Sequence, residues 1–307
     1  MERVIVVGAG VIGSAIALEL HQRGVGTVLL ESDSAGGQTS IASAGMVNPF
    51  SLTPHDSEAI PFYLASRDRY PQWVETVQQI TGIDVGWRMT GSLRVALTDS
   101  ECEHLQSMVG WVSRYEPQAR LLNSAEVREL EPALSASCDR ALYVPSEGRV
   151  QTERLMHALH SALRYEGVDC YWGQPVLGFV QEQGQVRGVV TATGTLYADA
   201  VVVASGAWSG GLLQSLGLAI PVQPVRGQTV LLTELPLPMR HIVVSPIGYL
   251  VPHADGTLLL GATREQAGFD FRATAEGFAH LLHTLSRLSP RLMHATLAGH
   301  TVGLRPG

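Results

Sequence analysis

The first 31 residues contain the feature that most constrains how this chain can fold. The apolar, β-branched run Val4–Val7 predicts a parallel strand that is buried on both faces. The pattern Gly8-x-Gly10-x-x-Gly13 follows at once, and the apolar spacing from Ile12 to Arg23 predicts a helix. A second buried strand, Thr27–Leu30, ends at Glu31. The segment therefore predicts a β-α-β unit whose first turn is rich in glycine.

These residue types in this order suit an adenine dinucleotide. Gly8 permits a tight turn, Gly10 lets a pyrophosphate approach the backbone, and Gly13 lets helix and strand pack closely. The helix N-terminus offers unpaired N–H groups to the phosphates, and the Glu31 carboxylate can accept the ribose hydroxyls. The unit by itself leaves NAD and FAD open. The loop from Ala35 to Gly45 is rich in small and hydroxyl residues, which suit a flat cofactor and its phosphates.

The sequence contains no lysine, so all 21 residues counted as Lys+Arg are arginine. A pyridoxal enzyme needs a lysine for its Schiff base, and a Walker-type loop needs a lysine on the phosphates. Arginine does not readily lose its proton and cannot replace lysine in these roles. Both classes of protein are therefore excluded. The formal net charge of −7 argues against a nucleic acid partner, because such a surface repels phosphates.

Length and composition predict a globular protein of the cytoplasm. A chain of 307 residues exceeds one minimal core and favours two lobes, or one large α/β body with an insert. Cys102, Cys138 and Cys170 have no metal-ligand spacing, so we expect reduced thiols and no metal site. The uncharged run Val4–Leu18 is too short to span a membrane, and its glycine spacing argues against a secretion signal.

The rest of the chain alternates between helical and extended segments. Apolar periodicity predicts helices at Ser57–Ile80, Glu101–Tyr115, Thr152–Glu166 and Thr274–Arg287. Asn123 and Glu126 have the spacing of a capping box at the start of a short helix. Strands are predicted at Ser92–Leu97, Ala141–Val144, Val176–Val180, Val186–Thr191, Ala200–Ala204, Val225–Leu232, Tyr249–Pro252, Leu258–Gly261 and Thr296–Leu304.

Several motifs in this order resemble the D-amino acid oxidase superfamily of flavoproteins. They are the Val4–Glu31 unit, the loop Thr39-Ser40…Ala44-Gly45-Met46, and the segments Asp199–Ser209, Tyr249–Pro252, Gly261-Ala-Thr263 and Gly303-Leu-Arg305-Pro-Gly307. Within the superfamily the chain is most similar to the glycine oxidases of thiamine biosynthesis. The resemblance runs along essentially the whole chain, and it implies FAD as the cofactor.

The predicted fold is of the α/β class, with two interleaved domains. Residues 1–85, 141–218 and 298–307 are expected to form a Rossmann-like FAD-binding domain. Residues 86–140 and 219–297 are expected to form an α+β substrate domain built on a mostly antiparallel sheet.

The resemblance also implies roles for individual residues. Arg305 matches the arginine that holds the substrate carboxylate, and Tyr249 matches a tyrosine of the same pocket. The substrate is then a small amino acid such as glycine, oxidised to the imine and on to the oxo acid and ammonia, while dioxygen becomes hydrogen peroxide. The positions expected to bind FAD are Gly8, Gly10, Val11, Ile12, Gly13, Glu31, Ser32, Thr39, Ser40, Ala44, Gly45, Met46, Val176 and Gly206.

Three departures from the family pattern bear on these expectations. Ile247 stands where some glycine oxidases have a histidine, and Arg264 stands where some have a methionine. Both substitutions leave the substrate selectivity open. Family members also continue past the motif that ends at Gly307, with a glycine-rich segment that returns to the flavin. The chain is therefore expected to be truncated, with weaker FAD binding and exposed apolar surface.

Several alternatives stay open at this point. A sibling enzyme, such as a D-amino acid dehydrogenase or a sarcosine oxidase type, would share every motif above. A catalytically impaired FAD-binding remnant is a second alternative, and an NAD-dependent dehydrogenase is a third. The sequence also leaves open whether the protein forms a homo-oligomer.

Overall fold

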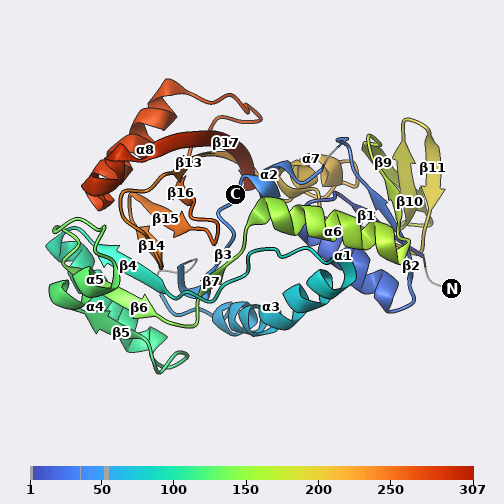
Figure 1. Ribbon diagram of the computed structural model, residues 1–307. Helices are drawn as coiled ribbons and strands as arrows, with labels where there is room; N and C mark the ends of the chain where they lie inside the picture. The colour runs from blue at the N-terminus through green and yellow to red at the C-terminus, as the bar shows by residue number, and fades with distance from the viewer. Residues whose placement is uncertain (1–2, 35, 52–54) are drawn as a thin grey trace.

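The computed structural model describes residues 3–34, 36–51 and 55–307 (Figure 1). One half of the fold is a parallel sheet in the order β12-β1-β2-β8. Its strands are β12 (Ala200–Val203), β1 (Arg3–Val7), β2 (Gly26–Leu30) and β8 (Asp169–Tyr171), and every neighbouring pair is parallel. The glycine-rich turn lies at the carboxyl end of β1, where an open α/β sheet binds its ligands.

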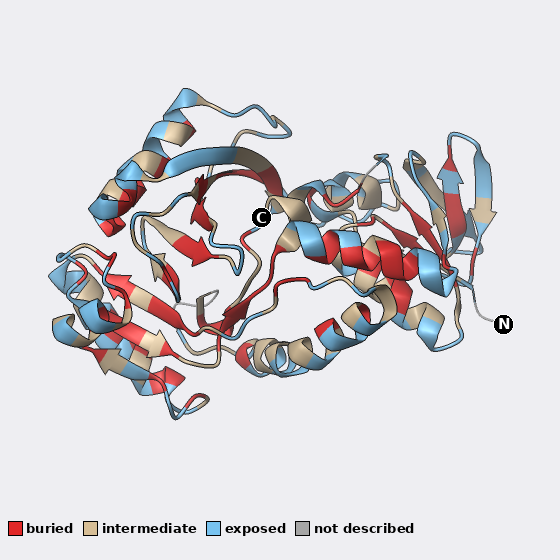
Figure 2. Cartoon of the chain, in the orientation of Figure 1, coloured by how far each residue is buried: buried red, intermediate tan, exposed pale blue. Residues whose placement is uncertain are grey.

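Both faces of the parallel sheet are covered. Val6 and Leu29 face the helices α1 (Val11–Gln22), α3 (Ile60–Thr81) and α6 (Thr152–Glu166). Ile5 and Val28 face the other side, towards the three-stranded antiparallel sheet of β9 (Val176–Glu182), β10 (Gln185–Thr191) and β11 (Gly194–Tyr197). In Figure 2, α6 shows buried positions where it meets the sheet and exposed ones outside. Burial on both faces explains why these strands are continuously apolar.

The other half of the fold is an eight-stranded sheet in the order β17-β13-β16-β15-β14-β4-β6-β5. All neighbouring pairs are antiparallel except β14 with β4, which are parallel. The strands are β4 (Ser92–Ala96), β5 (Arg120–Leu122), β6 (Arg140–Val144), β13 (Pro224–Thr233), β14 (Ile242–Ser245), β15 (Gly248–Pro252), β16 (Leu258–Gly261) and β17 (Thr296–Pro306).

Helices cover this sheet, and short elements connect the two halves. The helix α8 (Ala275–Leu288) and the short α5 (Ser124–Leu130) pack on one core, whereas α4 (Asp99–Val112) packs on another beside β4 and β6. The ladder of β3 (Met46–Val47) with β7 (Gly148–Arg149) lies where the halves meet. The remaining elements are α2 (Gln38–Ile41), α7 (Ser209–Gln214), and the 3-10 turns η1 (Pro49–Ser51), η2 (Gly206–Trp208) and η3 (Pro290–His294).

The predicted fold class is confirmed, and two local predictions need correction. The loop expected from Ala35 to Gly45 contains the one-turn helix α2; Ala35 itself lies outside the described residues. The helix expected from Ser57 begins only at Ile60, and Pro61 lies in its first turn, where a proline is well tolerated. The predicted domain boundaries stay a prediction, although β6 and β17 both lie in the eight-stranded sheet.

No helix in residues 3–34, 36–51 and 55–307 is long and apolar enough to cross a bilayer.

Candidate functional site

The glycines of the first turn are needed because the backbone there is crowded. Gly8 has a φ of +103°, in the region that favours glycine, and a Cβ on it would lie 2.6 Å from the Ala204 carbonyl oxygen. A Cβ on Gly13 would come well inside 3.0 Å of the Gly8 carbonyl oxygen. A side chain at Gly8 would push the turn away from the segment after β12, and one at Gly13 would push α1 away from the turn. These two glycines therefore fix where the N-terminus of α1 lies.

Glu31 and Ser40 hold this turn from the neighbouring segments. The Ala9 N–H donates to Glu31 Oε2 at 2.7 Å, and the Val11 N–H donates to Ser40 Oγ at 3.0 Å. Glu31 Oε1 accepts from the Ser32 hydroxyl and from the Asp33 N–H, each at 3.0 Å. The carboxylate is thus fixed at the end of β2 beside the turn.

The N-terminus of α1 has the features of a binding site for an anionic group. Its N-cap residue, Gly10, supplies no side-chain cap, and the first turn contains no acidic residue. A Cβ on Gly10 would meet only Ser40 Oγ within 4 Å, at 3.2 Å, so the backbone is open on that side. Ile12, in the same turn, is 65% exposed. The Val11 N–H is taken by Ser40, whereas the other N–H groups at the start of a helix have no acceptor within it and form a site for a phosphate.

The α2 loop joins this turn to the last strand. The Thr39 hydroxyl donates to the Leu304 carbonyl oxygen in β17 at 2.9 Å. Gly303 also faces α2, since a Cβ on it would lie 2.9 Å from the Ala42 Cβ. The contact places Arg305, the next residue along β17, close to the loop that holds the turn.

Arg305 and Tyr249 lie together on the eight-stranded sheet, as the sequence predicts. Gly261 is the β16 partner of Tyr249, and a Cβ there would fall 2.6 Å from the tyrosine hydroxyl oxygen. A Cβ on Gly227 would likewise collide with the Arg305 guanidinium. Burial raises the pKa of Tyr249, while the charge and hydrogen bonding of Arg305 act to lower it. The two glycines leave room for both side chains to lie flat against the sheet.

A network that the sequence did not reveal holds Arg305 from behind. Arg305 Nη1 donates to the Thr263 carbonyl oxygen at 3.1 Å. The Thr263 hydroxyl accepts from the Gln228 N–H at 2.9 Å and donates to Glu265 Oε1 at 2.5 Å. Glu265 Oε2 in turn accepts from Nε of the buried Arg226 at 3.0 Å and from its Nη2 at 2.5 Å. Thr263 belongs to the Gly261-Ala-Thr263 motif, but no motif signals Arg226, Gln228 or Glu265, which meet through the pairing of β13 with the segment after β16.

The other predicted cofactor positions are distributed around the turn. Ala44 is buried and Met46 packs on the same apolar cluster, which also contacts Tyr249. Val176 begins β9, just after Gln174, whose N–H donates to the Glu31 carbonyl oxygen at 2.7 Å. Gly206 begins η2 after β12 and is exposed. The structure thus brings Glu31 and Val176 near each other, on the nucleotide half of the fold.

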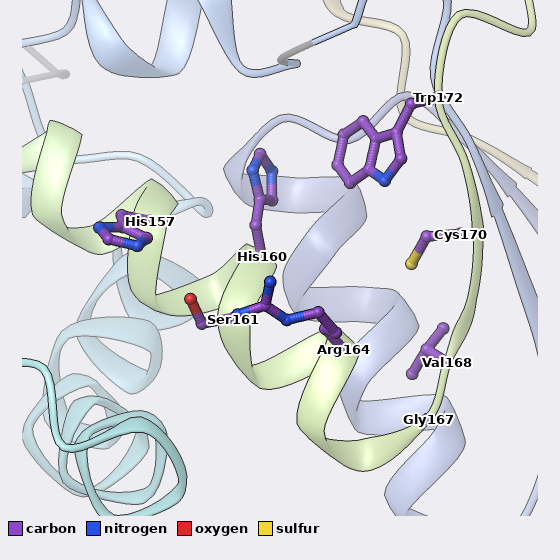
Figure 3. A pocket seen from close by; sticks show the side chains of 8 residues that line it. All are labelled: His157, His160, Ser161, Arg164, Gly167, Val168, Cys170 and Trp172. Carbon is purple, nitrogen blue, oxygen red and sulfur yellow. The ribbon is translucent and has the colours of Figure 1, made fainter.

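A separate cavity of about 460 Å³ lies between α6 and β8 (Figure 3). None of the predicted site residues lines it. His160, which does, packs edge-on against Trp172 and is hydrogen-bonded through Nε2 to the Ala9 carbonyl oxygen at 3.0 Å. This histidine therefore supports the glycine-rich turn from outside.

Comparison with known proteins decides the family. A model of the family described as "DAO: FAD dependent oxidoreductase" matches residues 3–307. The chain belongs to this family. FAD is accordingly the cofactor of this oxidoreductase, and the NAD alternative is set aside.

Relatives of this FAD dependent oxidoreductase match along the whole chain. The glycine oxidase of Pseudomonas putida is 34% identical over 307 residues, covering 100% of this chain and 83% of the relative. The bifunctional protein ThiO/ThiG of a Synechocystis species is 33% identical, over 99% of this chain and 45% of the relative. Among solved structures, glycine oxidase from Geobacillus kaustophilus has a TM-score of 0.94 at 33% identity, covering 100% of this chain and 83% of that one.

The residues present fit the FAD that the family implies. The turn at Gly8 and Gly13 admits no side chain, and Gly10 leaves the helix N-terminus open, as a pyrophosphate requires. Glu31 is a fixed carboxylate at the end of β2, where the ribose of an adenine dinucleotide is held in such folds. Both halves of an ADP-type ligand therefore find matching groups in this oxidoreductase.

Proposed function

We propose that this FAD dependent oxidoreductase oxidises a small amino acid, with glycine as the first candidate. The α-carbon of the substrate loses a hydride and the amine loses a proton, which gives the imine. Water then converts the imine to the oxo acid and ammonia, and dioxygen takes up the two electrons as hydrogen peroxide. Glycine oxidases among its relatives, such as those of Pseudomonas putida and Geobacillus kaustophilus, support glycine as the substrate.

The observation that carries this proposal is the pairing of Arg305 with Tyr249. A planar guanidinium matches a carboxylate in two-point geometry, which gives orientation as well as affinity. Thr263 accepts one N–H of Arg305 and the Tyr249 side chain is hydrogen-bonded to the same guanidinium, so the guanidinium is held at a fixed angle. Tyr249 adds an O–H donor to the same carboxylate.

FAD, when bound, supplies the two-electron acceptor for this reaction. The residues proposed to hold it are the glycines of the first turn, Val11, Ile12, Glu31, Ser32, Thr39, Ser40, Ala44, Gly45, Met46, Val176 and Gly206. The apolar cluster of Ala44, Ile242, Val251 and Leu259, with Met46 and Tyr249 against it, forms a dry wall beside the carboxylate anchor. Its role is to exclude water and keep the substrate amine against the acceptor.

The relative named ThiO/ThiG supports a place in thiamine biosynthesis. In that setting the imine from glycine would feed formation of the thiazole ring. We propose a cytoplasmic location, in keeping with three free cysteines and the absence of a membrane-spanning helix in the described part of the chain.

An anaerobic absorption spectrum tests the proposal. Glycine added under nitrogen to the yellow protein should bleach the flavin bands, and air should restore them with formation of peroxide. Arg305→Met should raise KM for glycine at least a hundredfold, because a charge-assisted, two-point contact is lost. Arg291→Met, at an exposed position in η3 outside the predicted site, is the matched control. If glycine, sarcosine and D-alanine all leave the spectrum unchanged, the proposal is wrong; bleaching without reoxidation by air would instead identify a dehydrogenase.

A further inference from the structure

Arg149 is a buried cation that forms no ion pair within the described part of the chain. The residue is 5% exposed, and its Nε and Nη1 are buried with no hydrogen-bond partner within residues 3–34, 36–51 and 55–307. No carboxylate of those residues forms an ion pair with it. A buried charge without a counter-charge is strongly destabilising, so such a group in a folded protein points to a ligand.

The charged groups around Arg149 leave it unpaired. Arg88 lies directly opposite Arg149 across an antiparallel backbone bridge. The Arg88 guanidinium donates to the Trp87 carbonyl oxygen and to Asp84. The charge of Asp255 acts on Arg149, but the oxygens of Asp255 accept hydrogen bonds from Gln151 at 2.6 Å and from Thr257 at 2.8 Å.

Two further basic groups complete the surroundings. Arg154 lies 3.9 Å from Asp255. Burial, together with the charge of Arg149, lowers the pKa of His253 to about 4, so this ring is neutral at pH 7. Burial also lowers the pKa of Arg149 to about 10, with a further contribution from the charge of Arg88. Arg149 therefore still carries a full charge at pH 7 and lacks only an anion.

Strand register shows which way Arg149 points. In the antiparallel β3–β7 ladder it is the direct partner of Met46, so both side chains lie on the same face. Met46 packs on the apolar cluster that Tyr249 also contacts. Tyr249 is the second residue of β15 and His253 follows the end of that strand, a distance of roughly 13 Å along the strand. Arg149 and Arg305 thus lie towards opposite ends of one apolar wall.

We propose that Arg149 binds a small oxyanion, a carboxylate in the first instance, where the β3–β7 ladder meets the β15–β16 hairpin. This site goes beyond the proposed function, which needs only the carboxylate anchor at Arg305. The oxyanion bound at Arg149 can come from two sources: a second acid group on the substrate, or a free carboxylate or phosphate ion.

The experiment uses the FAD-loaded protein in an Arg305→Met background, so that the anchor of the proposed function makes no contribution. The midpoint of thermal unfolding is measured against sodium acetate and sodium phosphate at constant ionic strength. The parent should show a saturable rise of several degrees. Adding Arg149→Met should weaken the apparent affinity at least tenfold, whereas adding Arg88→Met, the matched control, should leave most of the response.

A second measurement keeps the test decisive if an anion binds weakly. Without added anion, Arg149→Met should unfold at a higher temperature than its parent, because an uncompensated buried charge is replaced by an apolar side chain. An equal anion response with and without Arg149, or a lower midpoint for Arg149→Met in anion-free buffer, overturns the proposal.

Comparing iminodiacetate with acetate in protein that retains Arg305 then identifies the source. A substrate that spans both arginines binds more tightly as the diacid and loses affinity in either single variant. A free ion binds at Arg149 with the same affinity whether or not the protein retains Arg305. Because none of these readouts requires turnover, failure of the proposed oxidase activity would leave this test unaffected.

Discussion

Glu265→Gln should weaken substrate binding although Glu265 does not belong to the predicted site. The substitution keeps the shape of the side chain and removes its charge. Glu265 accepts from Arg226, Gln228 and Thr263, and Thr263 carries the carbonyl group that fixes Arg305. The glutamine amide keeps only one acceptor oxygen, so either Arg226 or the Thr263 hydroxyl loses its acceptor. Either loss loosens the segment that carries Thr263, and the guanidinium of Arg305 is held less firmly.

The magnitude follows from the burial of the pair. Breaking a fully buried ion pair costs about 3–5 kcal/mol, but here the Glu265 side chain is 27% exposed. Asp270 also remains 3.1 Å from Arg226 and continues to neutralise it. We therefore expect a loss of about 1–2 kcal/mol in unfolding free energy. If one hydrogen bond to the substrate is lost, KM for glycine rises about tenfold while kcat changes less than about threefold.

Asp270→Asn is the matched control. Asp270 also pairs with Arg226, and its other partner is Arg272, so it makes no bond to Thr263. Denaturant unfolding should show a comparable or smaller loss of stability, and steady-state oxygen consumption should show an unchanged KM. Equal rises in KM for the two variants would mean that Arg226 acts through general stability, and the reasoning from Thr263 to Arg305 would be refuted.

Three further predictions follow. Gly13→Ala should abolish the yellow colour of the purified protein, because its Cβ would collide with the Gly8 carbonyl group, whereas Gly110→Ala in α4 meets nothing within 4 Å and should retain FAD in a spectral assay. Asn123→Ala should lower the unfolding free energy in urea by about 1 kcal/mol, since it removes the capping box of α5; no change would contradict the capping role. Burial raises the pKa of Glu147 to about 7. The unfolding free energy of the wild type should therefore fall by up to about 3 kcal/mol as the pH rises from 4.5 through 7. Glu147→Gln should lack this fall, and parallel curves of unfolding free energy against pH for the two proteins would contradict the prediction.

The elements that the sequence predicted well are those specified by local chemistry. The β1–α1–β2 unit lies within one residue of its predicted bounds, because its continuously apolar strands and its glycine spacing are specified by adjacent positions. The Asn123–Glu126 capping box is confirmed with both of its reciprocal hydrogen bonds. Helix α6 matches its predicted bounds at both ends, with Gly167 in the left-handed conformation as its C-cap.

The elements that the sequence missed depend on distant partners. The strand β8 is Asp-Cys-Tyr, which has no apolar run, and it is a strand only because β2 pairs with it. The network behind Arg305 joins Arg226 to Glu265, which are 39 positions apart. Arg149 carried no signal either, since its lack of a partner is a property of the packed structure. A local sequence pattern can predict a turn. The hydrogen bonds that hold a side chain across a sheet depend on which distant strands pair, and the sequence does not show this.

The order of the parallel sheet has a consequence for how the chain matures during synthesis. The strand β1 leaves the ribosome first, yet one of its two neighbours, β12, begins about 190 residues later. At ordinary rates of translation, the backbone N–H and C=O groups along one edge of β1 remain unpaired for roughly ten to forty seconds. The same holds for β4, whose parallel neighbour β14 is also made late. A growing chain of this kind is exposed to premature edge-to-edge association, and slower elongation or a shortage of chaperones should show first as a loss of soluble product.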